Sequence, residues 1–294
     1  MTEELNVTAA PEIEIEVPSS GCPKQELVFN AKAKSSQSKT GNLLISWDFG
    51  DGQIAEGNVV KHTYTQGGNY TVKAKVVDTS LKVCNTAFAQ KSIKINSPPQ
   101  ARAGENIIRC FPASQPTLEV KFDGTSSSDA DGDTLTYYWD FGDGVTSNLA
   151  RPIHVYRKSG KYKVRLTVKD NSPLPCNTSE DAIDVILNHP PIADAGGDRT
   201  CCLNEPVLFS ASRSSDPDGD PLTYTWDFGD GTTGQGKEVT HTYNKPGEYK
   251  VTLVVSDNFA QSDCKSSTAG FIANVKQAPV AVMNIKPYYS TEGE

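Results

Sequence analysis

Hydrophobic and polar residues alternate along several short segments of this chain, which is the pattern of β-strands with one buried face. In residues 162–168, Tyr, Val, Leu and Val alternate with Lys, Arg and Thr, and residues 249–255 repeat this pattern. Clusters of Gly, Asp, Asn and Pro separate such segments, and no segment has the spacing of an amphipathic helix. The pattern therefore predicts an all-β fold built as an antiparallel β-sandwich.

The hexapeptide WDFGDG occurs three times and divides the chain into repeats. Its copies begin at Trp47, Trp139 and Trp226, so they are 92 and 87 residues apart. A His-x-Tyr motif and then a Gly-x-Tyr motif follow each copy at a constant distance; they begin at His62, His154 and His241, and at Gly68, Gly160 and Gly247. Three tandem copies of one domain therefore fill the chain.

The repeats and the paired prolines between them give the domain boundaries. The expected segments are a tail over residues 1–9, domains over 10–97, 98–189 and 190–278, and the start of a truncated further segment over 279–294. Paired prolines in the linkers at 96–104 and 188–196 favour short, stiff connections. We expect the three sandwiches to follow one another in a row.

The WDFGDG motif has a structural explanation in each copy. Its Trp and Phe share a face with the hydrophobic residues before them, so this face is expected in the core. Gly-Asp-Gly tolerates the positive φ of a tight turn, and the first Asp can accept hydrogen bonds from turn amides. The residues given this structural role are Trp47, Asp48, Trp139, Asp140, Trp226 and Asp227. A catalytic pair of Asp140 and Asp143 is the alternative, and the threefold recurrence favours structure.

The combination of W-D-F-G-D-G, H-T-Y and G-x-Y-x-V resembles the polycystic kidney disease (PKD) domain, and the resemblance covers all three copies. It implies immunoglobulin-like sandwiches of the kind found in microbial surface proteins, in secreted proteases and chitinases, and in polycystin-like glycoproteins. It implies no catalytic residues. The sequence also has no G-x-S-x-G, H-E-x-x-H or Walker motif, so we expect that the chain is not an enzyme.

Charge and hydropathy exclude two classes of partner. Lys and Arg number 28 against 36 Asp and Glu, which gives a net charge of -8 at pH 7, the wrong sign for binding nucleic acid. No apolar run approaches the roughly 18 residues of a transmembrane helix. The first ten residues also lack the basic start and apolar stretch of a signal peptide.

Six of the seven cysteines recur at equivalent positions, one upstream and one downstream of the repeated Trp in each copy. We predict one disulfide within each copy; the pairs are Cys22 with Cys84, Cys110 with Cys176, and Cys202 with Cys264. A rival pattern that joins neighbours, Cys84 with Cys110 and Cys176 with Cys202, leaves Cys22 and Cys264 unpaired. Cys201 is left over in either pattern, as a free thiol or an intermolecular link. Disulfides indicate an extracellular, cell-surface or periplasmic location.

Calcium is the one cofactor that the sequence suggests. Two copies carry carboxylates at every second position around a glycine, just before the central strand; these are Asp129, Asp131 and Asp133, and Asp216, Asp218 and Asp220. This spacing can gather the hard oxygen ligands that Ca²⁺ prefers. The first copy has no carboxylate in residues 35–42. The alternative is a turn whose Asp side chains cap backbone amides.

A ligand contact is considered at Tyr138, which faces away from the core if its neighbours Tyr137 and Trp139 face inward. We expect a non-catalytic spacer array that contacts extracellular proteins, polysaccharides or matrix polymers in the manner of an adhesion module. The alternative is the accessory substrate-binding region of a larger secreted hydrolase, a protease or a chitinase. Self-association through Cys201 is left open.

Overall fold

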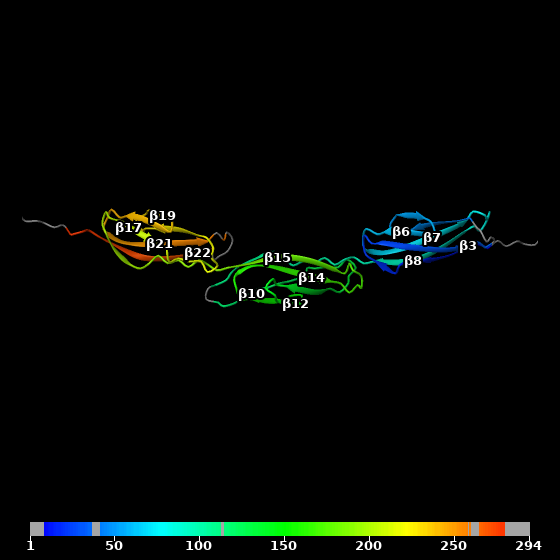
Figure 1. Cartoon of the computed structure of the whole chain (residues 1–294), viewed down its shortest axis with the longest axis horizontal. Coiled ribbons are helices and arrows are strands. Elements are labelled where there is room, and N and C mark those ends of the chain that lie inside the picture. The colour runs from blue at the N-terminus through cyan, green and yellow to red at the C-terminus, as the bar shows by residue number, and fades with distance from the viewer. Residues whose placement is uncertain (1–8, 37–41, 113–114, 258, 260–264, 280–294) are drawn as a thin grey trace, which may run out of the picture. The chain divides into compact units, whose positions relative to one another are not determined.

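The computed structural model describes residues 9–36, 42–112, 115–257, 259 and 265–279. Strands form three successive groups along the chain, one for each repeat, which we call repeats 1, 2 and 3 after the boundaries 10–97, 98–189 and 190–278 (Figure 1). Within the described residues there is no helix, and so none that could cross a bilayer. The all-β prediction is confirmed.

Each repeat contributes seven or eight strands. In repeat 1 they are β1 (Glu12–Glu16), β2 (Ser20–Gly21), β3 (Glu26–Lys34), β4 (Leu43–Asp48), β5 (Ile54–Glu56), β6 (Val59–Thr63), β7 (Gly68–Asp78) and β8 (Thr86–Ile95). In repeat 2 they are β9 (Ile107–Cys110), β10 (Leu118–Lys121), β11 (Thr136–Asp140), β12 (Thr146–Ser147), β13 (Ile153–Tyr156), β14 (Gly160–Lys169) and β15 (Thr178–Asn188). In repeat 3 they are β16 (Arg199–Cys202), β17 (Pro206–Ser210), β18 (Leu222–Asp227), β19 (Thr233–Gln235), β20 (Glu238–Thr242), β21 (Gly247–Asp257) and β22 (Ser266–Lys276).

The strands of a repeat form two sheets. In repeat 1 the orders are β1-β3-β6 and β2-β8-β7-β4-β5, and in repeat 3 they are β17-β20 and β16-β22-β21-β18-β19. The long strands pair antiparallel, as the alternation predicts. A short strand near the start of each repeat departs from this rule, because β2, β9 and β16 pair parallel with the ends of β8, β15 and β22. Residues just after this short strand therefore lie at the end of the sandwich where the last strand leaves it.

The core forms around the repeated Trp, and the predicted inward face is confirmed. Trp47, Trp139 and Trp226 are fully buried, together with Phe49, Phe141 and Phe228. In repeat 1, Trp47 packs with hydrophobic residues of both sheets, and its indole N–H donates to the Gly57 carbonyl over 3.0 Å. Burial of large aromatic side chains supplies much of the stability of such small domains.

The turn of the WDFGDG motif is held by its two aspartates and by the histidine. In repeat 1, Asp48 Oδ1 accepts from the Gly50 amide at 2.9 Å, and Asp51 Oδ2 lies 2.8 Å from the ring Nε2 of His62. The imidazole also stacks on Phe49, with ring centroids 4.0 Å apart. Repeats 2 and 3 reproduce all three contacts. The recurring aspartates and histidines therefore hold this turn in the same way in each repeat.

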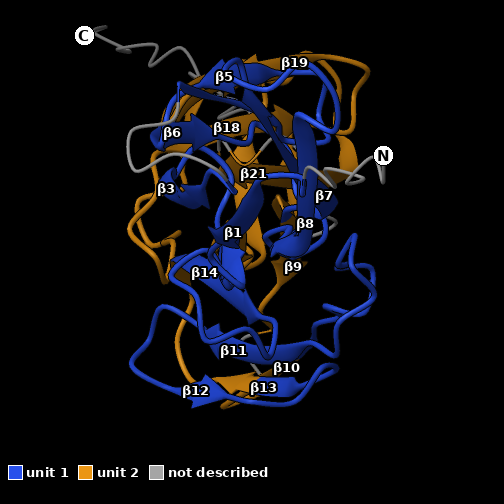
Figure 2. Ribbon diagram, turned by 90° about the vertical axis from the view of Figure 1, so that its right-hand side faces the viewer, with its two compact units in different colours: residues 1–106, 120–154, 162–184 blue, residues 107–119, 155–161, 185–294 orange. Residues whose placement is uncertain are grey.

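Contacts divide the chain into two compact units, and the boundary runs through repeat 2 (Figure 2). Unit 1 holds residues 1–106, 120–154 and 162–184, and unit 2 holds residues 107–119, 155–161 and 185–294. Repeat 1 and its junction with repeat 2 thus belong to unit 1. The junction that follows repeat 2, at residues 188–196, belongs with repeat 3 to unit 2.

The first glycine of the WDFGDG turn allows a test of this local structure. Gly142 has φ +80°, and a Cβ atom there would lie 2.8 Å from the Lys163 carbonyl oxygen. Gly144 has φ +89°, but a Cβ atom there would meet nothing within 4 Å. We expect Gly142→Ala to cost about 1–3 kcal/mol more unfolding free energy than Gly144→Ala, because only the first substitution adds a steric clash to the backbone strain.

The measurement is native-state hydrogen exchange of β14 at increasing urea, which reports on repeat 2 within the whole chain. Equal losses of protection in the two variants would contradict this account of the turn.

Candidate functional site

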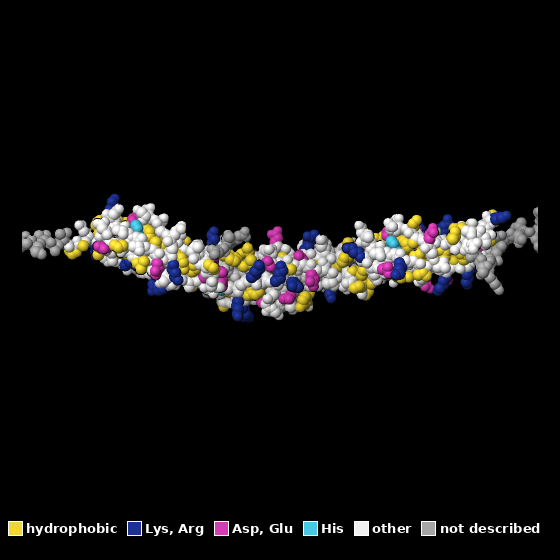
Figure 3. Space-filling model, turned by 45° about the horizontal axis from the view of Figure 1, so that its top comes forward, with side chains coloured by type: hydrophobic (Ala, Val, Ile, Leu, Met, Phe, Trp, Pro, Cys, Tyr) yellow, Lys and Arg dark blue, Asp and Glu magenta, His cyan; other side chains and the backbone are white. Residues whose placement is uncertain are grey.

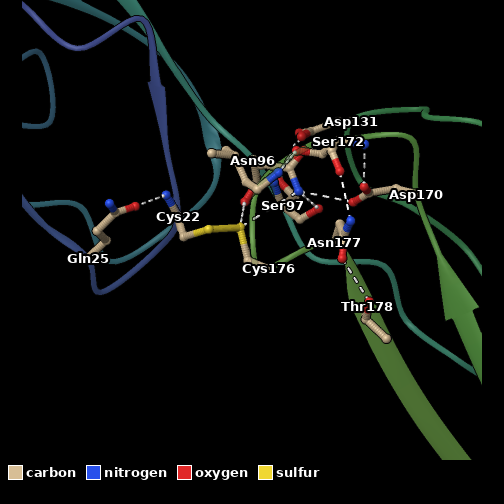
Figure 4. The surroundings of a disulfide bond; sticks show 11 residues. Cys22, Gln25, Asn96, Ser97, Asp131, Asp170, Ser172, Cys176, Asn177 and Thr178 are labelled. Carbon is tan, nitrogen blue, oxygen red and sulfur yellow. Dashed lines mark hydrogen bonds between the residues drawn. A yellow bond between two sulfur atoms is a disulfide. The ribbon is translucent and has the colours of Figure 1, made fainter.

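A disulfide crosses the boundary between repeats 1 and 2. Cys22 of repeat 1 is bonded to Cys176 of repeat 2, and their Cα atoms are 5.9 Å apart (Figure 4). The two cysteines are 154 residues apart in the sequence. In the chain-entropy model, closing so long a loop stabilises the folded state by about 5 kcal/mol. Both cysteines belong to unit 1, so the bond fixes one repeat to the next within a compact unit.

This bond corrects the predicted pairing of Cys22 with Cys84 and of Cys110 with Cys176, and the reason is strand direction. Cys22 directly follows β2, which pairs parallel with the end of β8, so that Gly21 lies beside Ile95. Cys84 precedes the first residue of β8, Thr86. The ten residues from Thr86 to Ile95 span about 30 Å, whereas a disulfide needs Cα atoms within roughly 7 Å. The two cysteines of repeat 1 therefore lie at opposite ends of the sandwich.

The remaining cysteines differ from the prediction as well. Cys84 and Cys202 are free and exposed, so the predicted pairs with these cysteines are wrong. Cys110 is disulfide-bonded, and Cys264 lies outside the described residues. Cys201 is a free, buried thiol whose pKa is raised by burial. The rival pattern also fails, because Cys84 is free and Cys176 is bonded to Cys22.

A buried hydrogen bond lies beside the disulfide (Figure 4). Asn96, the residue after β8, donates through Nδ2 to Asp170 Oδ2 of repeat 2 over 3.0 Å. Both side chains are buried, at 2% and 5% exposure. Asp170 Oδ1 accepts at the same time from the Ser172 amide. Each oxygen of a buried carboxylate thus has a donor, and loss of the linker donor would leave one oxygen unpaired at a cost of about 1–3 kcal/mol.

The next linker residue is bound by the acidic loop of repeat 2. Asp131 accepts from Ser97 twice, from the amide at 2.9 Å and from the hydroxyl at 2.8 Å. Lys94, on β8, extends its ammonium group to Asp133 at 3.4 Å. The acidic loop that the sequence suggests as a calcium site therefore contacts both the linker and the preceding repeat.

The linker after repeat 2 makes equivalent bonds to repeat 3. Asn188 donates to Asp257 Oδ2 at 2.9 Å, and the His189 amide donates to Asp218 Oδ2 at 2.7 Å. The ring Nδ1 of His189 also lies 2.8 Å from Asp218 Oδ1, and Ser159 donates to the same oxygen. Burial alone would raise the pKa of Asp218, but these hydrogen bonds outweigh it and lower the pKa. Both linkers are thus hydrogen-bonded to aspartates of the repeat that follows them. We call this set of hydrogen bonds the linker clamp.

Sequence reasoning missed the clamp, although a signal for it exists. Asn96 and Asn188 both stand two residues before a Pro-Pro pair. Asp78, Asp170 and Asp257 each lie 31 residues after the repeated Trp. Neither regularity by itself indicates a contact with the linker, because an Asp or Asn at the end of a strand is also what an ordinary turn requires.

The acidic cluster of repeat 3 differs by one residue from the predicted set. Asp129, Asp131 and Asp133 offer oxygens within 4.8 Å of one another, whereas in repeat 3 the equivalent group is Asp216, Asp220 and Asp257. Asp218 is absent from the second group and binds the linker instead. One buried oxygen of each cluster, Oδ2 of Asp129 and of Asp216, has no hydrogen-bond partner among the described residues. Burial, and then the neighbouring carboxylates of Asp216, Asp218 and Asp257, raise the pKa of Asp220.

Tyr138 is 48% exposed, whereas its neighbour Trp139 is fully buried. It lines a shallow surface pocket together with Tyr137, Thr136, Thr167 and Lys169. On the face shown in Figure 3, basic and acidic side chains are interspersed and form no large patch of one sign.

Comparison with known proteins gives the family of the repeats. A family model described as the PKD domain matches three successive segments, residues 8–93, 96–185 and 188–272. Together these matches cover most of the chain.

Three curated proteins share parts of this sequence. Collagenase ColA of Clostridium perfringens (strain 13 / Type A) is 37% identical over 131 residues, which cover 45% of this chain and 11% of the collagenase. Dyslexia-associated protein KIAA0319 of Homo sapiens is 29% identical over 273 residues, 84% of this chain and 25% of that protein. Pre-pro-metalloprotease PrtV of Vibrio cholerae (strain M66-2) is 34% identical over 148 residues, 48% of this chain and 16% of the protease. The chain thus spans a quarter or less of the length of these relatives.

Among solved structures, the PKD1 domain of Vibrio anguillarum Epp matches 31% of this chain and all of its own length, with 24% identity and a TM-score of 0.26.

Proposed function

Because this chain belongs to the PKD domain family, we propose that it acts as a non-catalytic, disulfide-stapled spacer in an extracellular protein. The observation that supports this function best is the bond between Cys22 and Cys176, which gives two consecutive repeats a second covalent connection besides the linker. A lone linker leaves two domains free to move against each other, which is the default for modules with small interfaces. The disulfide between Cys22 and Cys176 and the buried hydrogen bond from Asn96 to Asp170 oppose that motion.

The proposed location follows from chemistry and from the relatives. Disulfides persist in oxidising compartments and are rare in the cytosol. The matching regions of a collagenase and of a metalloprotease are small parts of larger proteins. A stapled spacer outside the cell would hold other domains, or a surface that binds a partner, at a set distance.

The spacer proposal predicts that the staple limits opening of the junction. Cys22→Ala should raise the rate of amide exchange at Ser97, because that amide is protected by its bond to Asp131 and opening of the junction would expose it. The measurement is hydrogen exchange with mass spectrometry on peptides that contain Ser97 but little of the sandwich core.

The matched control is Cys84→Ser, because Cys84 is a free and exposed cysteine of the same repeat. It should leave the exchange of Ser97 unchanged. If Cys22→Ala also leaves that exchange unchanged, the disulfide does not restrict the junction and the proposed role fails.

We also propose that Ca²⁺ binds the acidic clusters of repeats 2 and 3. The unpartnered oxygens of Asp129 and Asp216 and the raised pKa of Asp220 support this proposal, because each indicates a carboxylate group that lacks a compensating positive charge. In repeat 2 the ammonium group of Lys94 already lies near Asp133. The corresponding position before the second linker is Ile186, so we expect the cluster of Asp216, Asp220 and Asp257 to bind Ca²⁺ more tightly.

The expected result is that Ca²⁺ raises the unfolding temperature of repeats 2 and 3 but not that of repeat 1. At about one hundred times the dissociation constant the gain is about 2.7 kcal/mol for one site. Scanning calorimetry of the chain with and without Ca²⁺ measures it, with Mg²⁺ as the ionic control.

Asp216→Asn together with Asp220→Asn should remove the gain in repeat 3 and keep it in repeat 2. No shift with Ca²⁺, or an equal shift in all three repeats, would count against the calcium proposal.

A second candidate function, substrate binding for a secreted hydrolase, is favoured by the exposure of Tyr138 beside a shallow pocket. Exposed aromatic rings can stack on sugar rings or pack on extended chains. If this candidate is right, the chain should cosediment with one insoluble polymer among cellulose, chitin, collagen and peptidoglycan, and Tyr138→Ala should weaken that binding.

The matched control is Phe88→Ala, which removes another exposed aromatic ring, 71% exposed and in repeat 1. It should leave cosedimentation unchanged. Absence of binding to all four polymers, or equal loss in both variants, would argue against a substrate site at Tyr138.

A further inference from the structure

The outer face of the five-stranded sheet of repeat 1 exposes apolar side chains where the other repeats have polar ones. Ile54 on β5 is 79% exposed, and Phe88 on β8 is 71% exposed. The equivalent residues of the other repeats are all polar; they are Thr146 and Glu180 in repeat 2, and Thr233 and Thr268 in repeat 3. The fold of the repeat therefore requires neither apolar side chain.

Ile54 and Phe88 border one hollow in this face, with a volume of about 300 Å³. One cross-strand row passes through the hollow; across β5, β4, β7 and β8 it consists of Glu56, Ser46, Lys75 and Phe88. The small side chain of Ser46 leaves room between its larger neighbours. Exposed apolar side chains that cluster in this way mark a contact surface, whereas scattered ones need no explanation.

Charged side chains divide the same face into an acidic half and a basic half. Asp48 on β4 and Glu56 on β5 form the acidic half, and Lys73 and Lys75 on β7 form the basic half. All four are exposed. Within the described part of the chain, none of the four forms an ion pair. Both halves can therefore pair with charges of a partner.

The strand order makes this face complementary to itself. β5, β4, β7 and β8 are successive neighbours in the sheet. A twofold axis that runs along the strands, between β4 and β7, therefore places β4 of one copy over β7 of the other, and β5 over β8. Two sheets that pack face to face lie about 10 Å apart. In this arrangement the acidic half of each copy meets the basic half of the other.

We propose that the outer face of the five-stranded sheet of repeat 1 binds the same face of a second copy of this chain. Lys75 of one copy enters the hollow above Ser46 of the other, and its ammonium group donates to Glu56 on the neighbouring strand. Phe88 packs on Ile54. The twofold axis repeats each contact, so the interface is closed. Because the face is small, we expect a weak dimer in equilibrium with the monomer.

The first test is sedimentation velocity of the whole chain from about 10 µM to about 500 µM, the range in which weak interfaces associate. N-ethylmaleimide first blocks the exposed thiols of Cys84 and Cys202, so that no disulfide can join two copies. We expect a reversible shift from monomer to dimer and no larger species. A monomer at every concentration, or growth beyond the dimer, would overturn the proposal.

Substitutions borrowed from the other repeats test the apolar contact without threatening the fold. Phe88→Thr copies Thr268 of repeat 3 and should raise the dissociation constant of the dimer roughly tenfold, because it removes an aromatic ring from the interface. Ser46→Tyr copies Tyr138 of repeat 2 and should fill the hollow and abolish the dimer.

The matched control is Val59→Thr, which changes an apolar side chain that is 65% exposed on the other sheet of repeat 1. It should leave the dimer unchanged. Equal weakening by Val59→Thr and Phe88→Thr, or no effect of Phe88→Thr, would contradict the assigned face.

Charge reversal identifies the partner as a second copy. Glu56→Lys and Lys75→Glu should each weaken the dimer several-fold, because each places like charges opposite one another. An equimolar mixture of the two variants should restore association, since both ion pairs then join opposite charges. Weakening by both variants without recovery in the mixture would assign the face to a different partner and overturn the dimer. The spacer proposal is tested separately, by amide exchange at Ser97.

Discussion

The direction of one short strand determines how the repeats are joined. Because β2 runs parallel to β8 and pairs with its last residues, Cys22 emerges at the end of the sandwich where the chain leaves for repeat 2. The other cysteine of the repeat stands at the start of β8, at the opposite end. A bond within the repeat is thus out of reach, and a bond across the boundary is within reach. An antiparallel strand at this edge would reverse both conclusions.

At the junction of repeats 1 and 2, the buried carboxylate of Asp170 requires a specific donor from the linker, in addition to the disulfide. Asp170 is almost completely removed from water, so each of its oxygens must be matched by a donor within the protein. One donor is local, the Ser172 amide, and the other is Asn96 of the linker. Both oxygens of Asp170 therefore have a donor only when the linker before repeat 2 is in place. The disulfide between Cys22 and Cys176 lies beside this hydrogen bond and keeps the two repeats close enough for Asn96 to reach Asp170.

Much of the fold could be predicted from the sequence, since the alternation of strands and the recurrence of WDFGDG are local signals. The buried face of Trp47 and the structural role of its turn follow from parity and from turn chemistry. The disulfides could not be predicted in this way. In a tandem repeat, pairing within a copy and pairing between neighbours use equivalent positions, so spacing alone cannot separate them. The deciding fact was that β2 is parallel to β8, and two residues of strand carry too weak a pattern to reveal it.

The proposed cation sites share carboxylates with the linker clamp, so binding of a cation and binding of the linker are expected to affect each other. In repeat 3, Asp257 belongs to the acidic cluster and also receives the hydrogen bond of Asn188. In repeat 2, Asp131 belongs to the cluster and binds Ser97 with both oxygens. A cation held there would neutralise the repulsion among the carboxylates and fix the side chains that grip the linker. Binding of the ion and ordering of the junction would then favour each other, since each prepares the geometry that the other requires.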